Sequence, residues 1–522
     1  MNIILITFVT PASENIRGTS ALPYHMIKGG SPTPSLLEGE GDIAHNFSIY
    51  TFNNNALSDE KIKEVEKELN VSIKTIPLPK WYLWMMKLHL LFLRIFLEYP
   101  FLNYIKLPQK YVEDIKSQNP DLIWVYGEEL SRVVRQFPNT KRIQLGPDTE
   151  SLYYYRMLGQ RFVMKNPIDY WKCALMYRKY ARMERDFCTD ANFTYYAVGE
   201  EDVKFLKNLN PKVNAKFLRH PHYEVRDNVN FNFNKGLRHE NERDNFNVNF
   251  NFNKDISQEN ENGTHTDNKS ISKKFHSPKI KLLIAGQYNL YMKQEADLLI
   301  EQISANDNVN ENRLPLAPSN LEGELRNENE NSNFNVNLNF NEGDDYNDKS
   351  KNINPRNLCN PCEIPENTKT QSTSEAPIVH SSQLKKNYTI TFLGKGWEKH
   401  VEDLRKAGFE VNHIKFAPDY IEEICKHDIQ ITPIAIGTGT KGKVLDALAN
   451  GLLVIGTTYA LENIAVKHDE SCIEYHYPTE VIDILNDIPN NLDKYERMAE
   501  AGRQAVLKYH NRRKISSELF GG

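Results

Sequence analysis

The stretch of sequence that decides the fold is ITPIAIGTGTKGKVLDALANGLLVIGT, residues 431–457. A first apolar run ends at Gly437, a glycine-rich turn follows, and apolar residues then recur with helical spacing up to Gly451. A second apolar run comes next, so the order predicted is strand, tight turn, helix and strand. Such a turn exposes backbone N–H groups at a helix N-terminus, and Lys441 and Lys443 stand beside them. The stretch therefore predicts a site for a phosphate or diphosphate.

Two other interpretations of this turn stay open. In an ordinary βαβ crossover the glycines would serve packing only and the lysines would be solvated. In a P-loop, the spacing from Gly437 to Lys443 would be the G-x-x-x-x-G-K motif. However, Val444 stands where a Ser or Thr hydroxyl should hold the metal ion, which argues against a nucleotide hydrolase.

The same turn and helix resemble the donor-binding segment of GT-B glycosyltransferases of the group 1 (family 4) type. The likeness runs over about twenty consecutive positions, from G-T-G-T-K-G-K to V-I-G-T. In that family the loop and its basic residues hold the diphosphate of a nucleotide-sugar, and an acid in the helix binds the ribose. The resemblance implies catalytic roles for Lys443, Lys441 and Asp148. It implies donor binding by Gly18, Gly286, Gly437, Thr438, Gly439, Thr440 and Asp446.

Two departures from the family pattern concern its acidic pair, which is spaced E-x7-E. Thr438 stands in place of the first acid, and the second is Asp446 rather than Glu. The residue that contacts the sugar ring is therefore left open.

Weaker likenesses follow in the family's order along the chain. Residues 195–203 resemble its T-V-S-E-x-D strand and turn, and residues 279–287 resemble the first strand of the donor domain, where Gly286 approaches the diphosphate. In the first domain, Gly18 stands in the loop where these enzymes approach the sugar phosphates with backbone. Asp148 or Glu150, at the end of a strand, would orient an acceptor hydroxyl or cap the next helix.

Strand-like and helix-like segments alternate in both ordered parts of the chain, which favours parallel sheets covered on both faces. With the resemblance, the predicted fold is α/β, GT-B, with two doubly wound Rossmann-like domains facing a cleft and interrupted by disordered Asn-rich inserts. The predicted parts are an acceptor-side domain (1–225), an Asn-rich insert (226–276), a nucleotide-sugar-binding domain (277–508, with an insert at 304–386) and a C-terminal tail (509–522).

The inserts are identified by repeated, low-complexity sequence. The segment NVNFNFNK at 228–235 recurs at 247–254 and, altered, at 335–341. Its flanks are rich in Asn, Glu, Lys and Ser and cannot bury enough apolar surface to fold. Together with 30–42, these segments are predicted to be inserted sequence in loops, where insertion costs little stability.

Composition excludes several classes of function. The 522-residue chain has a net charge of −5, whereas a nucleic-acid partner would need a basic face. The C-x-x-C of Cys359 and Cys362 has no second pair nearby, so no zinc site is predicted. We expect no bound metal and no cofactor apart from the nucleotide-sugar co-substrate. The short apolar run at 1–9 lacks a basic lead-in and is predicted to be a first strand rather than a signal peptide.

The longest hydrophobic region, 81–105, is interrupted by charged residues such as Lys87, Arg94 and Glu98. A spanning helix needs about twenty mostly apolar residues, so a transmembrane segment is not expected. Two interpretations remain, a partly buried helix and a helix on a membrane surface. The expected location is cytoplasmic, with peripheral contact to the inner membrane face through 81–105 as the open alternative.

The resemblance implies a retaining, metal-independent, hexosyltransferase-like enzyme. It would move a sugar from a nucleotide-diphosphate sugar to a glycan or lipid-linked acceptor, in the synthesis of a surface polysaccharide. One alternative is a GT-B relative such as an NDP-sugar epimerase. Another is a degenerate, inactive copy that binds the nucleotide-sugar or nothing.

Overall fold

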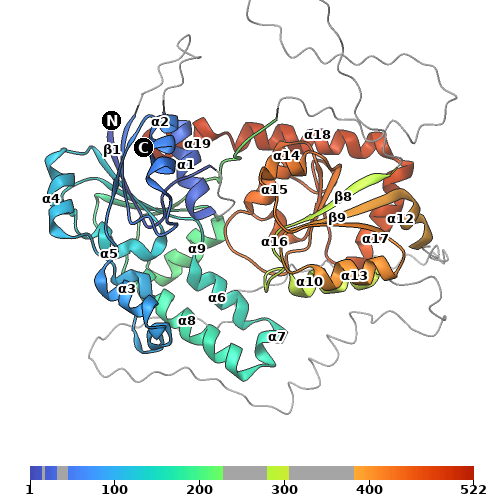
Figure 1. Ribbon diagram of the computed structural model, residues 1–522, viewed down its shortest axis with the longest axis horizontal. Coiled ribbons are helices and arrows are strands. Elements are labelled where there is room, and N and C mark those ends of the chain that lie inside the picture. Colours follow the sequence, from blue (N-terminus) through green and yellow to red (C-terminus); the bar gives the residue numbers. More distant parts are fainter. Residues whose placement is uncertain (14–17, 32–44, 227–278, 305–380, 522) are drawn as a thin grey trace, which may run out of the picture. The chain divides into compact units, whose positions relative to one another are not determined.

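The computed structural model describes residues 1–13, 18–31, 45–226, 279–304 and 381–521 (Figure 1). The predicted inserts at 226–276 and 304–386, the short piece at 30–42 and the pair Cys359 and Cys362 lie wholly or largely outside these residues. A short helix, α12 (Ser381–Asn387), occupies the last positions of the second predicted insert.

The first sheet has seven parallel strands in the order β3-β2-β1-β4-β5-β6-β7 within the described residues. Their order places β1 between β2 and β4, so the sheet is wound outward in both directions from its centre. The strands are β1 (Asn2–Thr7), β2 (Asn46–Thr51), β3 (Ser72–Thr75), β4 (Leu122–Tyr126), β5 (Arg142–Gly146), β6 (Phe193–Ala197) and β7 (Ala215–Phe217).

Both faces of this sheet are buried. Along β1, Ile3 and Leu5 join one apolar cluster, and Ile4 and Ile6 join another on the opposite face. This explains why the strand reads as a continuous apolar run. The helices of this part are α1 (Gly18–Gly30), α2 (Asp59–Leu69), α3 (Lys80–Lys87), α4 (Gln109–Ser117), α5 (Ser131–Val134), α6 (Glu150–Leu158), α7 (Arg161–Met164), α8 (Pro167–Arg185) and α9 (Glu200–Leu209).

The second sheet is also parallel, with the order β10-β9-β8-β11-β12-β13. Its strands are β8 (Ile280–Ala285), β9 (Tyr388–Leu393), β10 (Glu410–Ile414), β11 (Ile429–Thr432), β12 (Leu453–Gly456) and β13 (Ile473–Glu474). Its helices are α10 (Lys293–Ser304), α12, α13 (Glu398–Lys406), α14 (Tyr420–Ile424), α15 (Gly442–Ala449), α16 (Thr458–Leu461) and α17 (Pro478–Asp487). The predicted strand, turn, helix and strand are confirmed as β11, α15 and β12.

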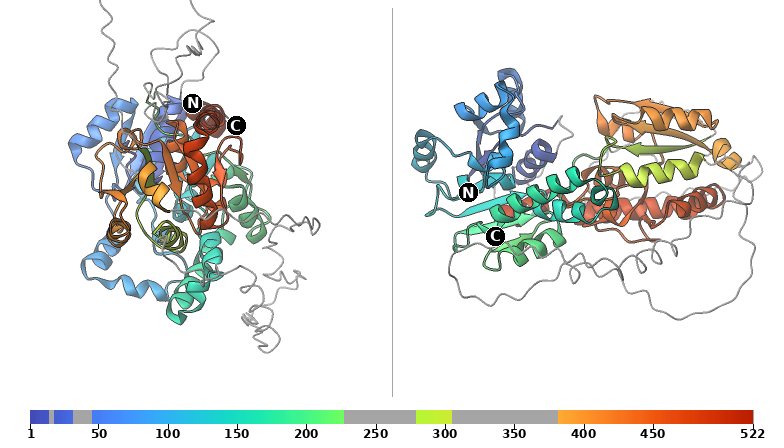
Figure 2. Two further views of the ribbon diagram at one scale, coloured as in Figure 1. Left: turned by 90° about the vertical axis from the view of Figure 1, so that its right-hand side faces the viewer. Right: turned by 90° about the horizontal axis from the view of Figure 1, so that it is seen from below.

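The last two helices, α18 (Leu492–Tyr509) and α19 (Arg512–Gly521), lead back to the first sheet. The ring of Phe520 lies 5.2 Å from the rings of Phe47 and Trp124. The C-terminus consequently lies near the N-terminus (Figures 1 and 2). The chain thus ends in the core of the domain in which it began.

The hydrophobic region at 81–105 does not form one helix, contrary to both interpretations of the sequence. After α3 the backbone of His89 is left-handed (φ 55°), and two short 3-10 helices follow at Leu90–Phe96 and Phe101–Tyr104. Pro100 separates these two, because its ring and its missing N–H prevent a continuous helix.

Candidate functional site

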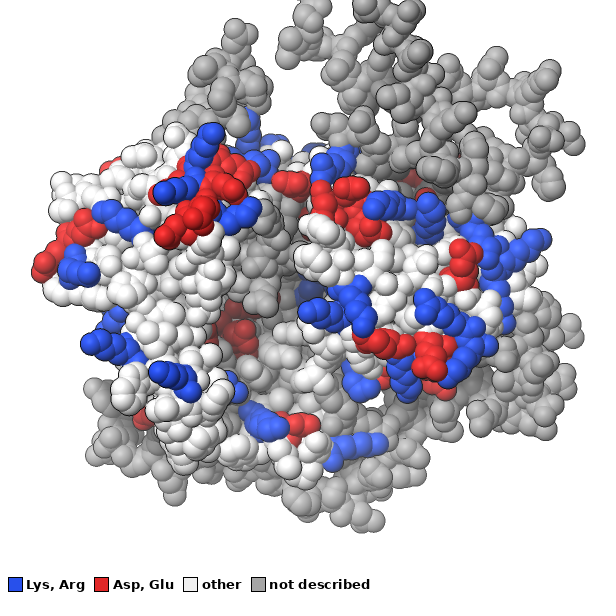
Figure 3. All heavy atoms as spheres, viewed as in Figure 1, with Lys and Arg blue, Asp and Glu red and all other residues white. Residues whose placement is uncertain are grey.

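The carboxyl ends of the two sheets line a cavity of about 810 Å³. Figure 3 shows the recess in this face of the molecule, with acidic side chains in its wall. Eight of the ten predicted site residues line it: Asp148, Gly286, Gly437, Thr438, Thr440, Lys441, Lys443 and Asp446. Gly439 and Gly18 do not, and Gly18 begins α1 directly after residues 14–17, which lie outside the described residues.

Lys443 reaches from the first turn of α15 to the end of β8. Its Nζ donates a hydrogen bond to the carbonyl oxygen of Ala285 (3.1 Å) and lies 3.4 Å from Sδ of Met292. Gly286 has φ 116°, a backbone conformation that favours glycine, and a Cβ at this position would lie 2.5 Å from Nζ, so another residue here would displace the ammonium group. Burial, and then the positive charge of Lys441, lower the pKa of Lys443 to about 8.

Lys441 stabilises the turn itself. Its Nζ donates to the carbonyl oxygens of Thr438 (2.6 Å) and Gly439 (3.2 Å). Burial lowers its pKa, and the negative charge of Asp148 opposes this change. The first backbone N–H groups of α15 have no acceptors within the helix, and the two lysines lie beside them, so this end of the cavity is suited to an anion.

Asp446 and Tyr420 lie elsewhere in the wall, each with an unpaired polar atom. Asp446 is 5% exposed, and neither its Oδ1 nor the Tyr420 hydroxyl has a hydrogen-bond partner among the described residues. Burial raises the pKa of Asp446 to about 7. Because unpaired buried polar atoms are unfavourable, this wall suits a ligand that carries hydroxyl groups, as a ribose does.

The opposite wall is acidic and comes from the first domain. Asp148 lies in the loop after β5, where its Oδ1 accepts a hydrogen bond from Thr438 (3.4 Å), and Glu150 begins α6. Burial raises the pKa of Asp148 to about 7. Burial, and then the charge of Asp148, raise that of Glu150 to about 8. These carboxyl groups can therefore exchange protons with a ligand near neutral pH.

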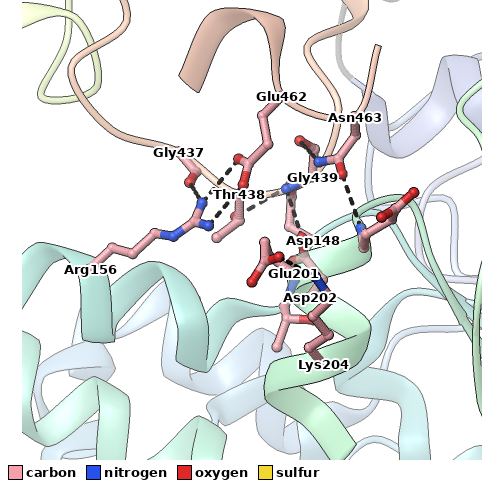
Figure 4. A network of polar contacts seen from close by, with 12 residues as sticks. Asp148, Arg156, Glu201, Asp202, Lys204, Gly437, Thr438, Gly439, Glu462 and Asn463 are labelled. Atoms are coloured by element: carbon pink, nitrogen blue, oxygen red, sulfur yellow. Dashed lines mark hydrogen bonds and ion pairs between the residues drawn. The ribbon is translucent and has the colours of Figure 1, made fainter. Parts of the chain in front are cut away.

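A network of polar contacts joins the predicted donor turn (residues 437–443) to the first domain (Figure 4). Arg156 of α6 pairs with Glu462 through both of its terminal nitrogens (3.0 and 2.8 Å) and also donates to the carbonyl oxygen of Gly437. The Gly439 N–H donates to Asp202 (3.1 Å), and its carbonyl oxygen accepts from Asn463 (3.0 Å). Gly439 therefore lies at the contact between the domains instead of in the cavity.

The sequence did not reveal the roles of Arg156, Glu462 and Tyr420. Arg156 and Glu462 are 306 residues apart, so no local pattern could pair them. Asp202 lies within the family-like segment 195–203, and that likeness was the one available signal for it.

No group of three or more His, Cys, Asp and Glu side chains in the described part of the chain could hold a metal ion. Metal independence stays a prediction. None of the described helices combines the length and apolar character needed to cross a membrane.

Comparison with known proteins supports the fold and the resemblance. Residues 376–520 match the family model described as "Glycosyl transferase-like". No curated protein sequence matches the chain. HepE from Anabaena, solved in complex with UDP, aligns with 99% of this chain and 98% of its own, at a TM-score of 0.50 and 9% identity.

A glycosyltransferase from Rickettsia africae aligns with 100% of this chain and 97% of its own, at a TM-score of 0.49 and 10% identity. WaaG, a glycosyltransferase involved in lipopolysaccharide biosynthesis, aligns over both complete chains at a TM-score of 0.47 and 11% identity. The family match and the likeness to HepE confirm the predicted GT-B fold and the resemblance to glycosyltransferases of the group 1 type.

Proposed function

We propose that this protein is a retaining glycosyltransferase that uses a nucleotide-diphosphate sugar as donor. The observation that carries the proposal is the cavity wall of the second domain. There, Lys443 and the N-terminus of α15 form an anion-binding end, and Asp446 and Tyr420 offer unpaired polar atoms. A uridine diphosphate sugar is the first donor to test, because HepE, which has the same fold, was solved with UDP.

The chemistry follows from the charges of the two walls. The bond between the anomeric carbon and the diphosphate breaks, and the positive charge of Lys443 and the helix N–H groups stabilise the leaving diphosphate. An acceptor hydroxyl on the acidic wall of Asp148 and Glu150 forms the new bond to the anomeric carbon and passes its proton to one of these carboxylates. In this scheme Lys443 and the helix N–H groups stabilise the negative charge that a metal ion would otherwise stabilise, so no metal ion is required.

The experiment is nucleotide release from a panel of UDP-, GDP- and other NDP-sugars, with a membrane extract as the acceptor source. We expect release with one donor, and its loss in Lys443→Ala. Lys426→Ala is the matched control, because Lys426 is an exposed lysine of the same domain that pairs with Glu423. Absence of release, together with no thermal stabilisation by any nucleoside diphosphate, would refute the donor site.

One observation leaves two alternative functions to be tested. Thr438, which stands in place of the family's first acid, is bonded to Asp148. An epimerase would convert the donor sugar without an acceptor, and analysis of the products would show the isomer. A degenerate copy would bind the nucleotide-sugar, or nothing, and would not turn it over.

We propose that the acceptor is a glycan or a lipid-linked molecule, and that the enzyme contacts the membrane through residues 81–105. Trp84 and Phe96 there are 68% and 77% exposed. Residues 80–106 carry four basic side chains and one acidic one, in a chain whose net charge is −5. Exposed aromatic residues next to basic ones suit an anionic lipid surface.

A second segment extends this surface. Ile168 and Trp171, near the start of α8, are also more than half exposed. Lys179 of the same helix donates to the carbonyl oxygen of Ile95 (3.2 Å), which fixes α8 beside the 3-10 helix at Leu90–Phe96.

Sedimentation with vesicles of phosphatidylglycerol and phosphatidylcholine tests the contact. We expect Trp84→Ser and Trp171→Ser each to weaken binding several-fold. Phe416→Ser is the control, since Phe416 is equally exposed on the second domain. Equal binding of all four proteins, or no binding by the wild type, would contradict the proposal.

A further inference from the structure

One carboxylate bonds to a loop from each domain. Asp202, in the first turn of α9, is completely buried. Its Oδ1 accepts the backbone N–H of Thr149 (2.8 Å), and its Oδ2 accepts the backbone N–H of Gly439 (3.1 Å). Thr149 separates Asp148 from Glu150, so this carboxylate connects the acidic wall of the cavity to the donor turn (Figure 4).

The approach of the two loops depends on glycine at two positions. Gly439 has φ 61°, and a Cβ there would overlap Oδ1 of Asp148 and lie 2.6 Å from the carbonyl oxygen of Pro147. At Gly199, a Cβ would overlap the Asp202 carboxylate. A side chain at Gly439 would push the loops apart and one at Gly199 would displace the carboxylate, so the geometry around Asp202 is closely fitted.

Neighbouring contacts fix the same turn to the same place. Thr440 Oγ1 donates to the carbonyl oxygen of Val198 (2.6 Å). Asn463 accepts the backbone N–H of Glu200 (3.0 Å) and donates to the carbonyl oxygen of Gly439 (3.0 Å). One side of the donor turn is thus occupied by protein, and its other side, with the two lysines, lines the cavity.

We propose that Asp202 is a positioning residue that holds the donor turn at a fixed distance from the acidic wall. It does not line the cavity, so it touches neither substrate. Its effect is to keep the diphosphate site and the acceptor site aligned when both substrates are bound. A misplacement of about 1 Å between reacting groups can lower a rate about 100-fold. This inference rests on the proposed transferase function.

Two variants remove the contact in different ways. Asp202→Asn has one amide nitrogen in place of an oxygen, and that nitrogen cannot accept an N–H. Gly199→Ala leaves the carboxylate intact but displaces it, and φ −132° at this position accommodates alanine. We expect kcat to fall about 10- to 100-fold in both variants, by the loss of alignment.

The affinity for UDP, measured by calorimetry, should stay within about twofold of wild type in both variants, because the phosphate-binding groups belong to the second domain alone. A loss of kcat with unchanged nucleotide affinity and unchanged binding stoichiometry is a result that a merely destabilised protein would not show, because an unfolded fraction would lower the stoichiometry. Asp190→Asn is the control, since Asp190 pairs with the buried Arg142 in the first domain and does not line the cavity. This variant should melt earlier but retain kcat.

Three results would overturn the inference. Unchanged kcat in both variants would exclude a positioning role. Tighter UDP binding by Asp202→Asn would mean that the carboxylate competes with the diphosphate for the Gly439 N–H. If the wild type turns over no donor, the proposed function fails instead. Hydrogen exchange of the Gly439 N–H then tests the contact alone, since exchange should be faster in Asp202→Asn than in wild type, and equal rates would refute it.

Discussion

The Nζ atom of Lys443 lies 3.1 Å from the carbonyl oxygen of Ala285, a residue 158 positions earlier in the chain. This hydrogen bond joins the glycine-rich turn to the end of β8. It directs the ammonium group over Gly286, where φ 116° favours glycine and a side chain would displace the lysine. The sequence pattern places Lys443 only beside a turn. The hydrogen bond fixes it in the wall of the cavity, next to the N-terminus of α15.

We predict that nucleotide-sugar affinity has a bell-shaped pH dependence with its optimum between about pH 7 and 8. Asp446 has a pKa of about 7, so its ability to accept ribose hydroxyls should grow as it ionises. Lys443 has a pKa of about 8, so attraction of the diphosphate should fall as it loses its proton above that pH. Calorimetry with UDP-glucose, whose diphosphate diester does not titrate in this range, measures the profile.

Two variants test which residue produces the rising limb and which the falling limb of this pH profile. Asp446→Asn should lose the rising limb, and Lys443→Met, which keeps most of the length of the side chain without its charge, should lose the falling limb. A profile that is flat in the wild type, or limbs that survive these changes, would contradict the assignment.

Glu150 is predicted to be the carboxylate that meets the acceptor. Both residues line the cavity, but Asp148 already accepts a hydrogen bond from Thr438. In Glu150→Gln we expect the KM for the acceptor to rise about tenfold, the magnitude of about one lost hydrogen bond, with the KM for the donor unchanged. Glu129→Gln is the control, since Glu129 is bonded to Tyr180.

The ion pair between Arg156 and Glu462 is predicted to stabilise the contact between the domains. Their side chains are 15% and 16% exposed, so solvent screens the pair only in part. Arg156→Met should lower the free energy of unfolding by about 2 kcal/mol, because it leaves the carboxylate and the Gly437 carbonyl oxygen without this donor. Chemical denaturation of both single variants and the double variant measures the coupling, and strictly additive effects would show that there is none.

Replacement of Gly439 by alanine is predicted to reduce both stability and activity. The left-handed backbone strains any other residue by about 1–2 kcal/mol, and the new Cβ would strike Asp148. Gly159→Ala is the matched control, since its φ is −78° and its Cβ would meet only a carbonyl oxygen at 3.5 Å. We would compare the melting temperatures and turnover of the two variants. Equal values for Gly439→Ala and Gly159→Ala would show that the turn does not require glycine at position 439.

Much of the architecture could be predicted because it depends on local pattern. Continuous apolar runs identify β1 and β11 as buried strands, and the helical spacing after Gly442 identifies α15. The region 81–105 was predicted wrongly as one helix, because its composition favours a helix and periodicity gives no weight to the left-handed turn at His89 or to Pro100.

The sequence by itself determined the two parallel sheets, the glycine-rich turn and the lysines beside it, because each follows from the spacing of neighbouring residues. Only the tertiary structure decided which of these residues line the cavity. The Gly439 N–H bonds to Asp202, 237 residues away, and Arg156 pairs with a residue 306 positions later. Such contacts depend on how the two sheets pack together, and no periodicity within either sheet encodes that packing.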